Sequence, residues 1–181
     1  LIIGASLSAD FSAPSPGRIL AEQNGHAPTV VACYLAGCGQ GSQLIKRLDE
    51  KQVASSSAVV ALDFAYWDSY NPDCSVGVGA VRELVTLAAK HRVPLVLGNA
   101  PNRNAGAWYR FWAGARSATQ QCRAAINSEI AKICTGQCRI FDLDGRNEQL
   151  RGREDELLTD GLHPGPVLSR MFARDIDAMV Q

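Results

Sequence analysis

Two short segments at opposite ends of the chain carry residue types that together perform nucleophilic catalysis. Ser6 closes the apolar segment LIIGAS, and Asp160 precedes His163 by three positions. A serine hydroxyl is a weak nucleophile at neutral pH, so it needs a base within hydrogen-bond reach and a third group that orients the base. His163 suits the role of base and Asp160 that of the orienting acceptor. The three residues are therefore a candidate triad, provided that the fold brings the two ends of the chain together.

Each segment alone also has an explanation that involves no catalysis. Serine is common in tight turns, so Ser6 is expected in the loop after a strand in any case. Asp160 lies where a loop joins a helix, and an aspartate there is well suited to cap the helix start. The catalytic interpretation is favoured because both segments occur in one chain whose fold places strand ends together.

Five short apolar runs alternate with segments that have helical periodicity. The predicted strands are 1–3, 28–34, 57–63, 93–97 and 138–143. The predicted helices are 17–23, one that starts near Ser42, 76–91, 115–134 and 164–180, while 144–159 reads as a loop with a short helix. This alternation predicts a five-stranded parallel sheet covered on both faces, a three-layer α/β/α sandwich. A chain of 181 residues is expected to form it as a single domain, 1–181.

Ligands of such sheets bind outside the carboxyl ends of the strands. Ser6, Gly37, Asp63 and the long loop 98–114 each follow a predicted strand, so all four are expected at one edge of the sheet. Aromatic and amide side chains in the loops after the third and fourth strands are candidates for substrate contacts, with anchoring of the loops to the core as the alternative. These candidates are Tyr66, Trp67, Asn99, Trp108 and Tyr109.

Composition excludes several other classes of function. Lys plus Arg and Asp plus Glu both number 18, so the chain offers no electrostatic argument for binding nucleic acid or an anionic membrane. No apolar run approaches the ~20 residues that span a bilayer, so an integral membrane protein is not expected. Triad chemistry requires no metal or organic cofactor, and the cysteine spacings do not match a zinc site. A flavodoxin-like nucleotide binder is disfavoured because the first turn lacks a glycine-rich phosphate loop.

The cysteine count of six is even and high for a domain of this size. It predicts disulfides and an oxidising compartment, periplasmic or extracellular, with buried free thiols as the alternative. Cys33 and Cys38 can bridge a strand exit, and Cys134 and Cys138 can bridge a helix end. Cys122 and Cys134 cannot pair across a straight helix, because twelve residues at ~1.5 Å rise separate them by ~18 Å. The chain also begins within a strand, which predicts that a segment precedes it.

The sequence resembles the GDSL/SGNH hydrolases over its whole length and in the order of their motif blocks. Gly4-Ala5-Ser6-Leu7 resembles their first block, G-D-S-L, with alanine in the aspartate position, and Asp160-x-x-His163 resembles their last block, D-x-x-H. The resemblance implies an α/β/α sandwich, with Ser6 as nucleophile, His163 as base and Asp160 as its orienter. It also implies an oxyanion hole formed by the N–H groups of Ser6 and Gly37, with Gly39 as the alternate glycine.

The third block departs from the family pattern. The family has G-x-N-D after the third strand, where the asparagine donates to the oxyanion, whereas this chain has Ala61-Leu62-Asp63-Phe64. An ionised aspartate accepts hydrogen bonds only and would repel the developing charge. Three explanations remain open: a protonated Asp63, a defective hole, or an Asp63 that points away while a neighbouring loop donates. The candidate donors in the third explanation are Asn99, Asn102 and Tyr66.

The leading functional hypothesis is a serine esterase that hydrolyses carboxylic esters of small molecules or glycans, with a small acyl group such as acetyl. The first alternative is an acyltransferase that uses the same site. The second is a glycan- or acyl-binding module that kept the fold and lost efficient catalysis, which the departure at Asp63 keeps open.

Overall fold

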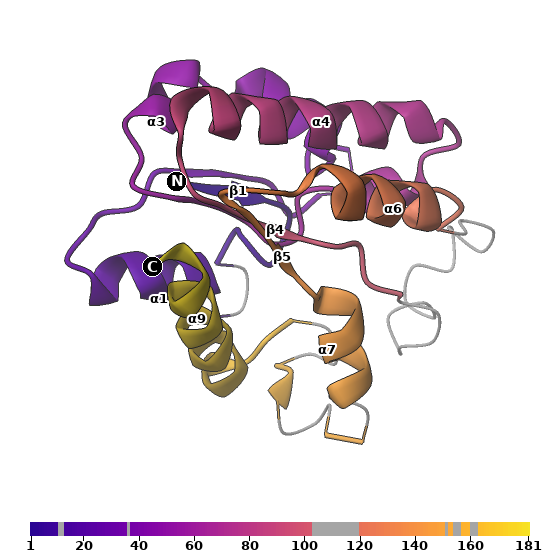
Figure 1. The fold of residues 1–181 in the computed structure, drawn as a ribbon. Coiled ribbons are helices and arrows are strands. Elements are labelled where there is room, and N and C mark those ends of the chain that lie inside the picture. Colours follow the sequence, from indigo (N-terminus) through magenta and orange to yellow (C-terminus); the bar gives the residue numbers. More distant parts are fainter. Residues whose placement is uncertain (11–12, 36, 103–119, 151, 154–156, 160–162) are drawn as a thin grey trace.

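A five-stranded parallel sheet lies at the centre of the protein (Figure 1). The structure is a computed structural model that describes residues 1–181 except 11–12, 36, 103–119, 151, 154–156 and 160–162. The strands are β1 (Ile2–Gly4), β2 (Val30–Ala32), β3 (Val59–Ala61), β4 (Leu95–Gly98) and β5 (Cys138–Phe141), in the order β2-β1-β3-β4-β5. The order reverses at β1, so β1 and β3 flank the point at which doubly wound sheets form a ligand crevice.

Helices cover both faces of the sheet (Figure 1). One face packs against α2 (Gly41–Leu44), α3 (Glu50–Ala54), α4 (Cys74–His91) and α6 (Arg123–Ile133). The other packs against α1 (Pro16–Gln23) and α9 (Pro166–Val180). Shorter elements are η1 (Ile45–Arg47), η2 (Trp67–Tyr70) and α7 (Leu143–Gln149).

Alternation along the central strands assigns side chains to the two cores. In β3, Val59 and Ala61 belong to the core under α4, while Val60 belongs to the core under α9. In β4, Leu95 and Leu97 face the first core and Val96 the second. Successive side chains of a strand point to opposite faces, so a central strand covered on both sides is apolar throughout. The apolar runs in the sequence reflect this double burial.

The predicted three-layer sandwich and its five strands are confirmed, but several boundaries differ. The helix predicted over 115–134 begins at Arg123, and its first part lies outside the described residues. Residues 120–122 are not helical, because the N–H of Cys122 bonds to the carbonyl of Ser69 at 3.1 Å and its sulfur is bonded to Cys74. The short helix α3 was not predicted, although Asp49 and Gln52 form a capping box at its start.

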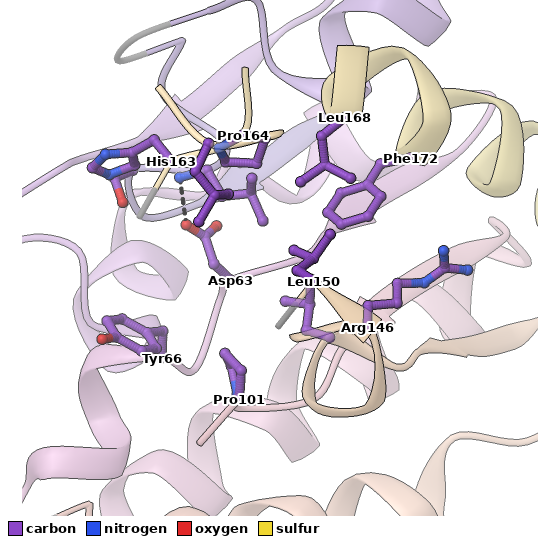
Figure 2. A pocket seen from close by; sticks show the side chains of 13 residues that line it. Asp63, Tyr66, Pro101, Arg146, Leu150, His163, Pro164, Leu168 and Phe172 are labelled. Carbon is purple, nitrogen blue, oxygen red and sulfur yellow. Dashed lines mark hydrogen bonds between the residues drawn. The ribbon is translucent and has the colours of Figure 1, made fainter. Parts of the chain in front are cut away.

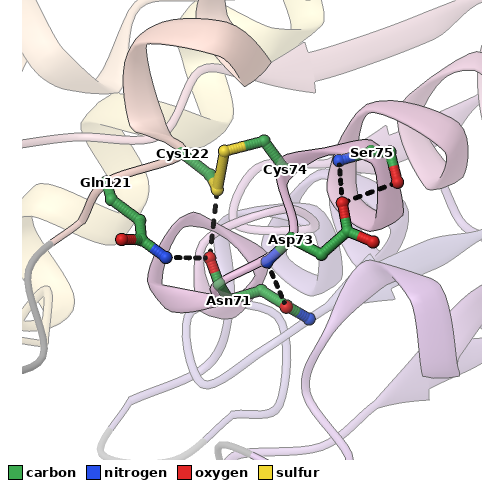
Figure 3. The surroundings of a disulfide bond; sticks show 6 residues. All are labelled: Asn71, Asp73, Cys74, Ser75, Gln121 and Cys122. Atoms are coloured by element: carbon green, nitrogen blue, oxygen red, sulfur yellow. Dashed lines mark hydrogen bonds between the residues drawn. A yellow bond between two sulfur atoms is a disulfide. The ribbon is translucent and has the colours of Figure 1, made fainter.

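All six cysteines are paired, as Cys33–Cys38, Cys74–Cys122 and Cys134–Cys138. The two short-range pairs are those considered possible from the sequence, and Cys122 and Cys134 lie at opposite ends of α6 as required. Figure 3 shows the Cys74–Cys122 bond, which joins the start of α4 to the residue before α6. Beside it, Asp73 caps α4 by accepting the N–H of Ser75 at 2.9 Å. Paired cysteines fit an oxidising compartment. Among the described helices, none is both long and apolar enough to cross a membrane.

The Cys74–Cys122 bond should contribute more to stability than either short-range bond. Its partners are 48 residues apart, against 4 for Cys134–Cys138. On the loop-entropy argument, Cys74→Ala/Cys122→Ala should lower the free energy of unfolding by about 4 kcal/mol and Cys134→Ala/Cys138→Ala by about 2 kcal/mol. Urea unfolding of the two double variants measures the difference. Equal losses would contradict the expectation.

Candidate active site

Ser6 lies in a tight turn directly after β1. The N–H of Ser8 bonds to the carbonyl of Ala5 at 3.2 Å, and the N–H of Ala9 bonds to that of Ser6 at 3.3 Å. Ser6 itself is half-buried and lines a pocket at the carboxyl ends of the strands. Residues 5–9 carry the candidate nucleophile, Ser6, and are named the nucleophile turn.

Asp63, which follows β3, binds the nucleophile turn through both carboxylate oxygens. Oδ1 accepts the N–H of Ala5 at 2.9 Å and the hydroxyl of Ser8 at 2.7 Å, and Oδ2 accepts the N–H of Leu7 at 2.6 Å. The two neighbours of Ser6 are therefore held by one side chain from the adjacent strand. A carboxylate with three donors around it fixes the turn far more firmly than the two turn hydrogen bonds alone.

Gly4 makes this contact possible. A Cβ atom at this position would overlap Oδ1 of Asp63 and Oγ of Ser8. A glycine is therefore required where the carboxylate passes under the backbone of the nucleophile turn. The Gly-Ala-Ser sequence thus has a steric basis at its first position.

The environment of Asp63 opposes ionisation in one respect and favours it in another. Burial raises the pKa of Asp63 above that of an exposed aspartic acid, while the hydrogen bonds from Ser8, Leu7 and Ala5 offset part of the rise. Of the three explanations considered for this departure from the family pattern, the contacts agree with a carboxylate directed at the backbone of the nucleophile turn.

His163 lies between α7 and α9, in a segment whose described residues 157–159 and 163–165 are named the histidine loop. The N–H of Thr159 bonds to the carbonyl of His163 at 2.8 Å, and the N–H of Gly165 bonds to the carbonyl of Leu157 at 2.8 Å. Leu158 and Pro164 form an antiparallel bridge between the same two segments. These contacts fix the backbone of His163, whose side chain is buried. Asp160, the predicted orienting residue, lies outside the described residues.

Ser6 and His163 line the same pocket, although they are at opposite ends of the chain. Figure 2 shows His163 in this pocket. Asp63 and Tyr66 from the loop after β3 and Pro101 from the loop after β4 also line it. The remaining lining residues come from the nucleophile turn, α7, the histidine loop and α9: Leu7, Leu143, Arg146, Leu150, Leu158, Pro164, Leu168 and Phe172. The predicted convergence of strand-end residues at one edge of the sheet therefore holds for Ser6, Asp63 and Tyr66.

The candidate oxyanion donors differ in whether their backbone N–H groups are already hydrogen-bonded. Among the residues that the structure describes, no acceptor is bonded to the N–H of Ser6 or of Gly37. The N–H of Gly39, in contrast, bonds to the carbonyl of Leu35 at 2.7 Å. A Cβ on Gly39 would meet the carbonyl oxygens of Cys33 and Leu35, so this glycine is needed for close packing. Gly37 is exposed and is not part of the pocket lining.

A second buried aspartate binds the segment that follows this glycine turn. Asp68 accepts the N–H of Gly41 at 2.5 Å and that of Ser42 at 3.4 Å, at the start of α2. Burial raises the pKa of Asp68 as well, and its hydrogen bonds oppose the rise. The sequence reasoning did not single out Asp68. Its only signal was an acidic residue among aromatic residues in a strand-end loop.

The other residues predicted to contact substrate do not line the pocket or lie outside the described residues. Asn99 is not part of the pocket lining, because its amide donates to Asp142 at 2.8 Å and accepts the N–H of Asp144 at 3.0 Å. Trp67 packs edge-on against Tyr66 with ring centroids 5.0 Å apart and does not line the pocket. Trp108 and Tyr109 lie outside the described residues. Within the described part of the chain, no group of three or more His, Cys, Asp or Glu side chains is arranged to hold a metal ion.

The sheet order and the two helical layers define the class as a doubly wound α/β/α sandwich that an esterase of known structure shares. The psychrotrophic esterase EstA from Pseudoalteromonas sp., solved in a form inhibited by monoethylphosphonate, superposes with a TM-score of 0.63. The match covers 99% of this chain and 94% of that one at 12% sequence identity, so it establishes a common fold. No protein-family model and no curated protein matches the sequence.

Asp63 should make the protein less stable as pH rises. Its pKa is raised in the folded state, so the folded protein binds more protons than the unfolded chain between the ordinary aspartate pKa, about 3.9, and the folded-state value. The free energy of unfolding should therefore fall with rising pH in that window and level off above it. In the Asp63→Asn variant the free energy of unfolding should depend less on pH in this window, because the titrating carboxyl group is gone. Urea unfolding across the acidic range measures both proteins.

Asp73→Asn is a control of opposite sign. Hydrogen bonds from Ser75 lower the pKa of Asp73, so the advantage of wild type over this variant should increase as pH rises. The advantage of wild type over Asp63→Asn should instead decrease. An advantage that increases in both cases would contradict the assignment for Asp63.

Gly4→Ala should disrupt the nucleophile turn. The added methyl group displaces the Asp63 carboxylate or the Ser8 hydroxyl, so we expect a loss of stability of about 1–3 kcal/mol, the usual cost of overpacking. Gly79→Ala is the matched control, because a Cβ there meets open space within α4. Thermal unfolding of both variants tests the expectation, which fails if Gly4→Ala is as stable as wild type.

Proposed function

We propose that the protein is a serine esterase that hydrolyses carboxylic esters through an acyl-serine intermediate. The observation that carries the proposal is the shared pocket of Ser6 and His163, with Ser6 in a turn that Asp63 holds from both sides. The fold common to this chain and an esterase adds support. The resemblance to the SGNH hydrolases is the basis for assigning Asp160 as the residue that orients His163.

The reaction would proceed in two halves. The hydroxyl oxygen of Ser6 attacks the ester carbonyl while His163 takes the hydroxyl proton, and the same proton passes to the departing alkoxide. Water then attacks the acyl-serine with His163 as base, which releases the carboxylic acid and restores Ser6. Each half passes through a tetrahedral intermediate whose oxyanion requires hydrogen-bond donors.

The N–H of Ser6 is our first candidate for that oxyanion hole. Asp63 takes the N–H groups on both sides of it and leaves that of Ser6 available at the pocket. Gly37, the glycine that the resemblance implies, is proposed as the second donor although it does not line the pocket, because the N–H of Gly39 is already bonded within its loop. Tyr66 is the only one of the three candidate side-chain donors that lines the pocket, so it is proposed for the place that asparagine has in the family.

Two alternatives use the same site. An acyltransferase would pass the acyl group to another hydroxyl instead of water, and a binding module would hold the ligand without turnover. The binding module is supported by one observation: the residue in the family's asparagine position accepts hydrogen bonds from the nucleophile turn and offers no donor. The three disulfides support a place of action outside the reducing cytosol, in the periplasm or the extracellular medium.

Labelling by a fluorophosphonate probe, together with turnover of p-nitrophenyl acetate, tests the esterase directly. Wild type should be labelled and Ser6→Ala should not, with a loss of at least ~10³-fold in turnover. Ser8→Ala is the matched control, because this serine is in the same turn but its hydroxyl is buried against Asp63. It should keep the labelling. A folded wild-type protein without labelling would overturn the esterase and favour the binding module.

A further inference from the structure

We infer that the pocket beside Ser6 binds an apolar acyl chain longer than acetyl. This inference rests on the proposed esterase function and names the acyl group that the esterase takes. It departs from the sequence-based expectation of a small acyl group, because most of the described residues that line the pocket are apolar.

The pocket has a polar end and an apolar end. Figure 2 shows Asp63, Tyr66 and His163 toward one side and Leu150, Leu168 and Phe172 toward the other. Leu7, Leu143 and Leu158 add further apolar surface, and Leu143, Leu168 and Phe172 are themselves buried in the core under α9. An apolar wall supported by the core is rigid, so it favours a ligand of fitting shape and hydrophobic character.

Arg146 does not make the apolar end polar, although it lines the pocket. Its guanidinium pairs with Asp175 at 2.5 Å and lies over the ring of Phe141, 4.3 Å from the centroid. The guanidinium also lies over the ring of Phe172, 5.5 Å from its centroid, and in Figure 2 it points away from Leu150. The pocket therefore receives the aliphatic part of Arg146, while the charge is satisfied elsewhere.

The polar side chains of Asp63, Tyr66 and His163 lie toward the other end of the pocket (Figure 2). Both oxygens of Asp63 are occupied by the nucleophile turn, and His163 and Tyr66 lie at the same end. A sugar ring in the apolar end would bury several hydroxyls without partners, at a cost for each. An alkyl chain buries none and gains from every methylene that leaves water.

The chemistry assigns this end to the acyl group and not to the alcohol. In the acyl-serine intermediate the acyl chain stays beside Ser6, whereas the alcohol must leave and water must reach the same carbon next to His163. An apolar end backed by the core suits the part that stays. The alcohol and water then use the side of Ser6 on which His163 lies.

Two ester series with purified wild-type protein test the inference. With p-nitrophenyl acetate, butanoate, hexanoate and octanoate below their aggregation limits, kcat/KM should rise by up to about fourfold per methylene until the pocket is filled. With the acetates of ethanol, butanol and hexanol, kcat/KM should stay nearly constant. A rise in the second series and not in the first would overturn the inference, because the apolar end would then bind the alcohol.

Leu150→Trp and Val167→Trp connect the preference to this pocket. Leu150 is a half-buried lining residue, and the added bulk should lower the ratio of hexanoate to acetate turnover by at least ~10-fold. Val167 is 51% exposed on α9 next to Leu168 and is not part of the lining, so Val167→Trp should leave the ratio unchanged. An unchanged ratio in Leu150→Trp, with the protein folded, would overturn the inference.

The failure of the inference and that of the proposed function are distinguishable. Fluorophosphonate labelling of Ser6 with equal rates for all chain lengths would overturn the apolar acyl pocket and leave the esterase intact. Absence of labelling and of turnover for every ester would overturn the esterase itself, and the inference with it.

Discussion

Asp63 holds the turn around Ser6 from a neighbouring strand, and its partner Ala5 is 58 residues away along the chain. The contact depends on several features at once. β1 and β3 must be adjacent and parallel, so that both chains leave the sheet at the same edge. Gly4 must lack a side chain, and the carboxylate must be buried, which raises its pKa. Three donated hydrogen bonds offset this cost. The candidate nucleophile is thus positioned by long-range structure and not by the sequence of its own turn.

The loop after β3 holds a second segment, the start of α2, with another buried carboxylate. Asp63 binds the nucleophile turn, and five residues later Asp68 binds the start of α2, which follows the glycine turn. Both contacts are made by buried carboxylates with backbone N–H donors, a pairing that is stronger than one between neutral groups. One loop therefore sets the relative position of the proposed nucleophile and of the loop that carries Gly37. Cys33–Cys38 closes that loop at its base, where the N–H of Cys33 bonds to the carbonyl of Gly4.

Most of the fold was predictable from the sequence, because the strands are buried on both faces and appear as apolar runs. The runs around Val59 and Val96 are examples, and alternation with helices then fixed the layers. Ser6 and His163 could be predicted as a candidate nucleophile and base from their residue types. The rule that ligands bind at the carboxyl ends of parallel strands placed Ser6 and Asp63 together. The role of Asp63 was not predictable, since a carboxylate after a strand gives no indication of which backbone it binds. The start of α6 at Arg123 depended on the Cys74–Cys122 bond, a long-range pairing that spacing alone cannot reveal. The apolar end of the pocket is made by residues of α7, the histidine loop and α9, whose helical periodicity indicated core packing only.

The distance along the chain between Asp63 and the residues it binds has a consequence for the order of folding. A chain that has emerged only as far as β2 contains Ser6 but lacks the carboxylate that shapes its turn. His163 comes later still, with the loop that precedes α9. The candidate site therefore assembles only when the centre of the sheet and the last helix are in place. Fragments and partly folded chains should carry an ordinary, unreactive serine, so reactivity at Ser6 would report completion of the fold.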